Sequence, residues 1–277
     1  MIASEFEYFA PTEVGEALDL LHTKGDGARP LAGGMSLVPL MRVGMRHPAV
    51  VVSLHYVTGL DRVKDLGPAL SIGAMCRHTA VARDPLVLRD APLLARAAAS
   101  IGDVQIRNRG TLGGSIAHAD PAADYPSALV ALGATMIVRS AGGERRVPAA
   151  EFFVDVMRTV LEADELIVAV EVPKHTGLGF AHERLQRVEG EFPIVLASLQ
   201  LLPGGAGRLA LGGVGVKPVA LELAQTSADE ASLCALGRRA FDAAAGARGD
   251  SNGSREYRQA MARVMSERAL LAACGGK

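Results

Sequence analysis

Two short segments of the sequence combine adjacent glycines with a hydroxyl side chain, a combination that can bind an anion. The first glycine loop is Ala32-Gly33-Gly34-Met35-Ser36, and the second glycine loop is Thr111-Leu112-Gly113-Gly114-Ser115. Because glycine has no Cβ, successive backbone N–H groups can turn toward one anion, and a Ser or Thr hydroxyl adds a donor. Either segment alone is explained equally well as a tight turn. The presence of both favours a cradle for a diphosphate group.

The sequence lacks the patterns of other nucleotide-binding and hydrolytic sites. There is no GxxxxGK[ST] segment, and the glycines between residues 212 and 215 do not form GxGxxG, so a P-loop and a Rossmann fingerprint are both missing. His182-Glu183 lacks the second histidine of a zinc protease, and neither glycine loop completes the GxSxG of a hydrolase. The residues therefore offer no hydrolase constellation, and no pattern among them indicates a catalytic nucleophile, acid or base.

The bulk composition excludes several classes of partner and site. The 277 residues include 29 Lys and Arg against 30 Asp and Glu, for a formal net charge of −1, so no basic surface is expected for a nucleic acid or an anionic membrane. The three cysteines are isolated in the sequence: Cys76, Cys234 and Cys274. Without a CxxC pair, the sequence predicts no disulfide framework and no zinc or iron–sulfur site built by this chain alone.

No segment of the sequence is predicted to span a membrane. The longest uncharged apolar run, residues 128–138, has 11 residues, whereas a bilayer requires ~20. Glu5 and Glu7 lie where a secretory signal would require basic and then apolar residues. We therefore expect a cytoplasmic protein whose partners are a small ligand or other proteins.

Helices are expected at both ends of the chain and in its middle. Apolar residues at helical spacing predict a helix over residues 13–22, with Thr12 as its N-cap, and an Ala- and Leu-rich helix within residues 91–100. After residue 232 two helices are predicted, separated by a glycine-rich link at residues 246–253. The second of these is expected to present one apolar face, formed by Tyr257, Met261, Val264 and Met265.

Short β-branched or Leu-rich runs bounded by Gly, Pro or charged residues predict strands. They cover residues 50–54, 70–74, 166–172 and 194–202. Strands mixed with helices in no regular alternation predict an α+β protein and not a doubly wound sheet. Shifts in composition suggest boundaries near residues 55 and 175, which divide the chain into segments 1–55, 56–175 and 176–277.

A longer stretch around the glycine loops resembles a known family. TLGGSIAHADPAADYP, preceded by QIRNRG and paired with AGGMSLVPLM upstream, is similar to the FAD-binding subunit of the xanthine oxidase and carbon monoxide dehydrogenase family of molybdenum hydroxylases. Further similarity in RTVLEADELIVAVEVP, RLQRVEGEFPIVLAS and SREYRQAMARVMSERAL extends the resemblance over nearly the whole chain. The resemblance implies a two-subdomain FAD-binding fold of the PCMH type, followed by a C-terminal domain of a sheet and helices.

The resemblance also implies roles for individual residues. The FAD diphosphate is expected between the two glycine loops, and Asp124 is expected to anchor the ribityl or ribose hydroxyls. Ile101 is expected to pack against the flavin, Leu166 or Ile167 to offer backbone contacts, and Arg184 to lie near the isoalloxazine. No metal ligand is expected on this chain.

In such an enzyme a large subunit carries the molybdenum cofactor and a small subunit carries 2Fe–2S clusters. The resemblance implies that this chain binds both subunits, as a dimer of heterotrimers, and that its FAD passes their electrons to an external acceptor. The substrate would be chosen by the molybdenum subunit. Two alternatives stay open: a free-standing FAD-dependent oxidase or dehydrogenase of the same flavin-fold class, and a scaffold subunit without FAD.

Overall fold

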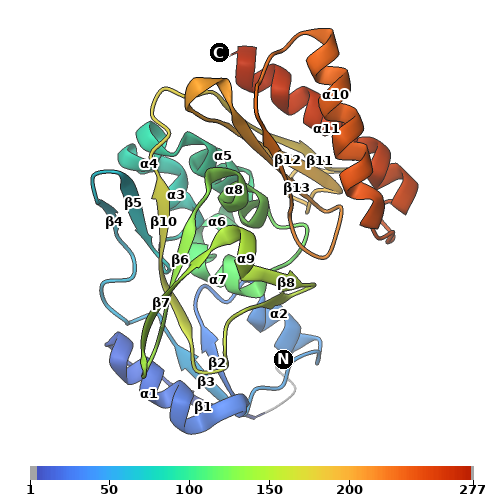
Figure 1. Ribbon diagram of the computed structural model, residues 1–277. Helices are drawn as coiled ribbons and strands as arrows, with labels where there is room; N and C mark the ends of the chain where they lie inside the picture. Colours follow the sequence, from blue (N-terminus) through green and yellow to red (C-terminus); the bar gives the residue numbers. More distant parts are fainter. Residues whose placement is uncertain (1–4, 276–277) are drawn as a thin grey trace.

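The computed structural model describes residues 5–275, and its first sheet is small and parallel (Figure 1). The strand order is β1-β3-β2, formed by β1 (Glu7–Phe9), β2 (Ala28–Leu31) and β3 (Val50–Ser53). Helix α1 (Val14–Lys24) and the 3-10 turn η1 (Gly25–Gly27) connect β1 to β2, while α2 (Leu37–Arg42) lies between β2 and β3. All four residues of β3 are buried, as expected for a central parallel strand.

The second sheet is antiparallel, with the strand order β4-β5-β10-β6-β7. Its strands are β4 (Val63–Asp65), β5 (Ala69–Gly73), β6 (Thr135–Ser140), β7 (Gly143–Pro148) and β10 (Leu166–Pro173). The helices between β5 and β6 are α3 (His78–Arg83), α4 (Pro85–Asp90), α5 (Pro92–Ser100), α6 (Val104–Arg109), α7 (Leu112–His118) and α8 (Asp124–Leu132). After β7 come α9 (Ala149–Phe152) and the hairpin of β8 (Phe153–Asp155) and β9 (Arg158–Thr159).

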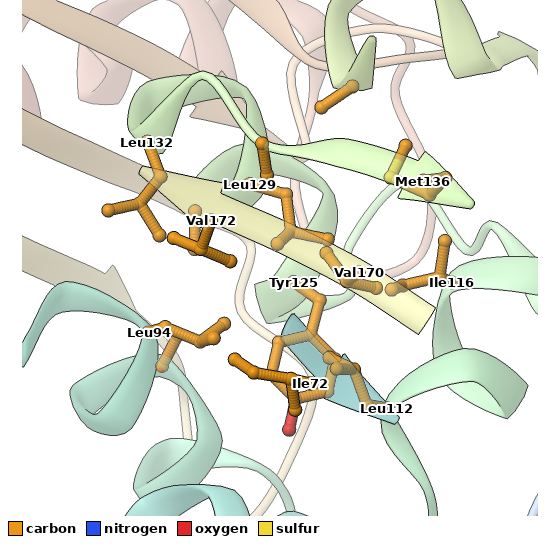
Figure 2. Packing of buried hydrophobic residues seen from close by; sticks show 14 of the residues in the cluster. Ile72, Leu94, Leu112, Ile116, Tyr125, Leu129, Leu132, Met136, Val170 and Val172 are labelled. Carbon is orange, nitrogen blue, oxygen red and sulfur yellow. The ribbon is translucent and has the colours of Figure 1, made fainter. Parts of the chain in front are cut away.

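The core of this part lies between the second sheet and its helices (Figure 2). Ile72 and Val170 from the sheet belong to the same buried cluster as Leu94 of α5 and Leu129 of α8. Every residue of α8 is buried. The apolar run at 128–138 is therefore a buried helix end joined to the first half of β6, of which residues 136–138 are buried, and Gly133 at a φ of 66° ends the helix.

The third sheet is antiparallel and follows sequence order (Figure 1). It is formed by β11 (Phe180–Leu185), β12 (Val195–Leu201), β13 (Gly207–Gly212) and β14 (Val219–Leu223), with η2 (Pro203–Gly205) between β12 and β13. Two helices follow, α10 (Glu230–Ala243) and α11 (Arg255–Gly275), with η3 (Ala244–Gly246) between them. Helix α11 packs on β11 and β12, whereas α8 contacts β12 and β13. Because β12 lies between helices, all but the last of its residues are buried.

The predicted α+β class and the predicted strands are confirmed, but two details of the helices are wrong. Thr12 does not cap α1; its backbone N–H donates to the Glu16 carboxylate at 3.1 Å, and the N-cap position falls on Glu13. Tyr257 is 42 % exposed, so it does not belong to the buried face of α11. The position is taken by its neighbour Arg258, which is buried and pairs with Asp250 at 2.7 Å.

The described helices include none that is both long and apolar enough to cross a membrane. The longest, α11, carries several charged residues and packs on the third sheet.

Candidate functional site

A cavity of about 460 Å³ lies where the first sheet, the second sheet and the helices after β5 meet. Its volume falls within the range of about 300–1,000 Å³ that is usual for ligand sites. Most residues predicted from the sequence line it: Ala32, Gly33, Gly34, Met35, Ser36, Ile101, Thr111, Gly113, Gly114, Ser115, Asp124, Leu166 and Ile167. Leu112 and Arg184 do not. The tertiary structure therefore brings together segments that are up to about 130 residues apart in the sequence.

The first glycine loop connects the end of β2 to the start of α2 and offers free backbone donors. Among the described residues, the N–H groups of residues 33–36 donate to no protein acceptor. Gly34 has a φ of +76°, a conformation that L side chains rarely adopt. A Cβ on Gly33 would overlap the carbonyl group of Arg109. The glycines thus allow both the turn and a close approach to the segment before the second loop.

The second glycine loop has a different geometry from the one predicted. Thr111 is the N-cap of α7, and its Oγ1 accepts from the Gly114 N–H at 3.2 Å. The N–H groups of Leu112 and Gly113 donate to carbonyls of the segment at residues 74–76, at 2.9 and 2.8 Å. These backbone donors are therefore already satisfied, and the expectation of a second set of free N–H groups is wrong. The loop presents hydroxyls and bare glycine Cα atoms to the cavity instead.

Leu112 is completely buried in the core of the second sheet. Its side chain anchors the first turn of α7 and has no contact with the cavity. Gly113 allows the first turn of α7 to lie close to the end of β5, because a Cβ on Gly113 would lie 2.5 Å from the Ala74 Cβ.

Asp124, the first residue of α8, is 3 % exposed and lines the cavity. Its Oδ1 lies 2.9 Å from Nε2 of His182 and 2.8 Å from Nε of Arg184. The Arg184 Nε–H is not aligned for a hydrogen bond, so that contact is an ion pair only. One carboxylate oxygen is thus held by the chain.

Arg184 was expected near the isoalloxazine, but it does not line the cavity. Its guanidinium donates to the carbonyl of Ser100 at 2.8 Å and to that of Glu191 at 3.0 Å. These two bonds, with the ion pair to Asp124, direct the planar fork away from the cavity. In this structure Arg184 therefore holds the end of α5 and the loop before β12 beside Asp124.

A closed ring of buried polar groups continues from Asp124 into the third sheet. Nδ1 of His182 lies 2.9 Å from the Ser198 hydroxyl, which lies 3.0 Å from the hydroxyl of Ser127. The Ser127 hydroxyl donates back to the Asp124 carbonyl at 3.2 Å. An Asp, a His and a Ser thus come together as in a hydrolase, but the ring lies under the cavity, because His182 and Ser198 do not line it. The ring connects α8 to β11 and β12 of the third sheet.

The remaining predicted residues form the apolar part of the cavity. Leu166 and Ile167 begin β10, just before a bulge in its pairing with β6. Ile101 follows the end of α5, and Phe192 from the loop before β12 also reaches the cavity. Phe192 is 60 % exposed. Apolar side chains at the start of a strand and on an exposed loop suit a flat aromatic ligand.

His78, which the sequence analysis missed, lines the polar part of the cavity. It begins α3, is 3 % exposed, and its Nδ1 lies 3.0 Å from the hydroxyl of Tyr125. Burial lowers the pKa of His78 to about 4, although the nearby Asp124 carboxylate opposes the change. The same burial raises the pKa of Tyr125 well above its usual range. Both groups are therefore neutral at neutral pH.

The described residues contain no group of His, Cys, Asp or Glu side chains that could hold a metal ion. Cys76 is buried, and burial raises the pKa of its thiol to about 11. It is therefore a core residue and not a reactive thiol.

Comparisons with known proteins show the family of this chain. Residues 4–175 match the family described as the FAD binding domain in molybdopterin dehydrogenase. The chain is 35 % identical to the carbon monoxide dehydrogenase medium chain of Hydrogenophaga pseudoflava, over 99 % of this chain and 98 % of that one. It is 33 % identical to the nicotine 6-hydroxylase medium subunit of Paenarthrobacter nicotinovorans, with 96 % of each chain covered.

Solved structures show the same fold. The carbon monoxide dehydrogenase of Hydrogenophaga pseudoflava matches with a TM-score of 0.93 at 35 % identity, covering 99 % of both chains. The quinoline 2-oxidoreductase of Pseudomonas putida 86 matches with a TM-score of 0.89 at 34 % identity, covering 98 % of both. The chain therefore belongs to the family of FAD-binding medium subunits of molybdenum hydroxylases, and it is a subunit of an oxidoreductase.

Proposed function

We propose that this chain binds one FAD in the cavity and acts as the electron-transfer subunit of a molybdenum hydroxylase. The observation that carries the proposal is the joining, around one cavity, of both glycine loops, a buried carboxylate and an apolar strand end. FAD itself supplies the redox chemistry, because its ring accepts electrons singly and releases them in pairs. The residues of this chain bind, orient and shield it.

The residues present fit this cofactor. Free N–H groups in the first glycine loop, with the hydroxyls of Ser36 and Thr111, are donors that a diphosphate accepts. Asp124 offers an acceptor for sugar hydroxyls, since an ionised oxygen makes the stronger hydrogen bond. Ile101, Leu166 and Ile167 would pack against the flavin ring. Arg184 would act through Asp124, whose carboxylate it holds in place.

We further propose that electrons reach this chain from 2Fe–2S clusters on a small partner subunit. A large partner would carry the molybdenum cofactor and choose the substrate, and an external acceptor would take the electrons from the FAD. Relatives named as medium chains or medium subunits support the existence of other chains in the complex. The assembly we expect is a dimer of heterotrimers.

The division into segments 1–55, 56–175 and 176–277 is proposed as the domain organisation. It is supported by the sheets, because the first ends at residue 53, the second spans residues 63–173, and the third begins at residue 180.

The test is to purify the protein in its native assembly, record its absorption spectrum and identify the chains present. The proposal requires flavin bands, iron–sulfur absorption and two further chains of different size. A flavin-containing monomer of 28.8 kDa that turns over a substrate by itself would favour the free-standing oxidase. An assembly of three chains without flavin would favour the scaffold.

A further inference from the structure

Two polar atoms of buried side chains that line the cavity have no partner in the described part of the chain. They are Nε2 of His78 and Oδ2 of Asp124; both side chains are 3 % exposed and both line the cavity. Four side-chain atoms are fully occluded without a partner among the described residues: Arg184 Nε, Gln186 Oε1, Gln200 Oε1 and Arg258 Nε. Since the two cavity atoms are not among them, each must be open to the cavity.

Tyr125 decides which nitrogen of His78 carries the proton. Tyr125 is fully buried, and its hydroxyl has one partner in the described chain, Nδ1 of His78 at 3.0 Å. If Nδ1–H donated to the phenol oxygen, the phenol proton would be buried without an acceptor, which is unfavourable. The phenol therefore donates to Nδ1, and because the imidazole is neutral, its proton lies on Nε2. His78 thus presents an N–H donor to the cavity.

The orientation of the Asp124 carboxylate is set in the same way. His182 and Arg184 both contact Oδ1, so Oδ2 is the oxygen left for a ligand. Asp124 and Tyr125 are consecutive residues at the start of α8. The first turn of α8 therefore positions both the acceptor, Asp124 Oδ2, and the Tyr125 hydroxyl that orients the donor His78.

Gly110 leaves room for this donor. A Cβ on Gly110 would lie 2.5 Å from Nε2 of His78, and Gly110 itself lines the cavity. The backbone N–H of His78 donates to the Gly110 carbonyl at 3.1 Å, which keeps the two residues together. The missing side chain thus lets the His78 ring lie directly against the Gly110 backbone, one residue before the second glycine loop.

We propose that His78 is a second ligand of the sugar-alcohol hydroxyl assigned above to Asp124: its Nε2–H donates to the hydroxyl of the bound FAD from which Asp124 Oδ2 accepts, so that the two residues form a hydroxyl-binding pair. A hydroxyl group both accepts and donates, so it satisfies both atoms. A phosphate or a ring carbonyl only accepts, so it would leave Oδ2 unsatisfied and would be repelled by its charge. The proposal rests on the proposed function. The hydroxyl belongs either to the ribityl chain or to the ribose of the adenosine half.

The experiment measures binding of FAD and of FAD analogues to the full chain after removal of its flavin, by quenching of flavin fluorescence. Each analogue lacks one hydroxyl, in one set from the ribityl chain and in the other from the ribose. The wild type is expected to bind at least one analogue about tenfold more weakly than FAD, since one hydrogen bond to a buried group is lost. The set that contains this analogue identifies the source of the hydroxyl.

Variants of His78 show whether this residue is responsible for the discrimination between FAD and the analogue that lacks the hydroxyl. In His78→Leu the discrimination should shrink to within about threefold, whereas His78→Gln keeps an N–H donor and should retain more of it. The matched control is His175→Leu. His175 is also buried, with Nε2 at 3.1 Å from the Leu132 carbonyl, but it does not line the cavity, so discrimination should stay as in the wild type.

Equal binding of FAD and all analogues by the wild type would overturn the pair, and so would full discrimination in a folded His78→Leu variant. If His78→Leu does not fold, the wild-type series and His78→Gln decide. A wild-type chain that binds no FAD would instead remove the proposed function itself, and the pair with it.

Discussion

Nε2 of His182 lies 2.9 Å from Oδ1 of Asp124, and both side chains are buried where the third sheet meets α8. His182 belongs to β11, whereas Asp124 begins α8 and lines the cavity. The third sheet therefore supports the binding site through His182, although His182 itself does not line the cavity. Any change that moves β11 should move the carboxylate as well.

Replacing His182 by Leu should weaken both folding and FAD binding. The Asp124 carboxylate and the Ser198 hydroxyl would each lose one of two buried contacts, and the loss of a buried hydrogen-bond partner costs about 1–3 kcal/mol. We expect a loss of this size in the free energy of unfolding, measured by urea denaturation, together with weaker FAD binding. Ser198→Ala is the milder control, since it leaves the His182–Asp124 bond in place. Unchanged stability and FAD affinity in His182→Leu would show that the ring is dispensable.

Replacing Gly114 by Val should displace FAD before it unfolds the protein. Gly114 lies within α7 at an ordinary negative φ, so the obstacle is steric: an added Cβ would lie 2.8 Å from Thr111 Oγ1 and 3.4 Å from the Ala32 Cβ. The added bulk falls between the two glycine loops. Because FAD is proposed to lie between these loops, the clash falls on the complex more than on the flavin-free chain. An overpacking cost of about 1–3 kcal/mol in the complex corresponds to roughly tenfold to hundredfold weaker binding.

The measurement for Gly114→Val is FAD content per folded protein, with circular dichroism to establish folding. Gly15→Val is the matched control, because Gly15 also lies in a helix and has no atom within 4 Å of its Cβ position. Full FAD occupancy in a well-folded Gly114→Val variant would remove the second loop from the binding site.

FAD is expected to be held without a covalent bond. The sequence contains no recognisable flavin-attachment motif, and the cavity lining in the described chain includes His78 and His118 but no cysteine. Precipitation with acid should therefore release all the yellow colour into the supernatant. Colour that stays in the pellet after unfolding would contradict this prediction.

Stability should fall as the pH drops below neutral, and His78 should account for part of the loss. Its pKa is about 4 in the folded chain against 6.5 as the ordinary value. Above pH 6.5 the imidazole is neutral in both states, so its contribution is fully present. Between pH 6.5 and 4 the unfolded chain binds a proton that the folded chain does not, and stability is lost at up to about 1.4 kcal/mol per pH unit.

Burial also lowers the pKa values of His118 and His175, so both add to the loss in the same direction. Urea denaturation of the flavin-free chain at pH 7 and pH 5 measures the total. In His78→Gln the difference between the two pH values should be about 2 kcal/mol smaller than in the wild type. His55→Gln, at an exposed histidine outside the cavity lining, is the matched control variant. An equal pH dependence in His78→Gln would mean that His78 titrates normally in the folded chain.

Local patterns in the sequence were sufficient for the elements and for the glycine loops. The strands predicted at residues 50–54 and 166–172 appear as β3 and β10. A run of β-branched residues between turn residues favours a strand through local preferences alone. The loop at residues 32–36 has its positive φ at Gly34, as adjacent glycines allow. The predictions for Thr12 and Tyr257 are wrong. The residue at which a helix begins, and the face of a helix that is buried, both depend on the elements that pack against the helix.

Contiguous motifs in the sequence were enough to identify the family, the α+β class and 13 of the residues around the cavity. How the polar groups are paired depends on contacts between segments that are distant in the sequence. His78 meets Tyr125, and Asp124 meets His182, across separations of 47 and 58 residues. Arg184 donates to backbone carbonyls and Leu112 packs in the core, because distant segments of the chain lie beside them in the fold. A hydrogen bond is satisfied by whichever partner the fold brings within reach, and no local pattern contains that information.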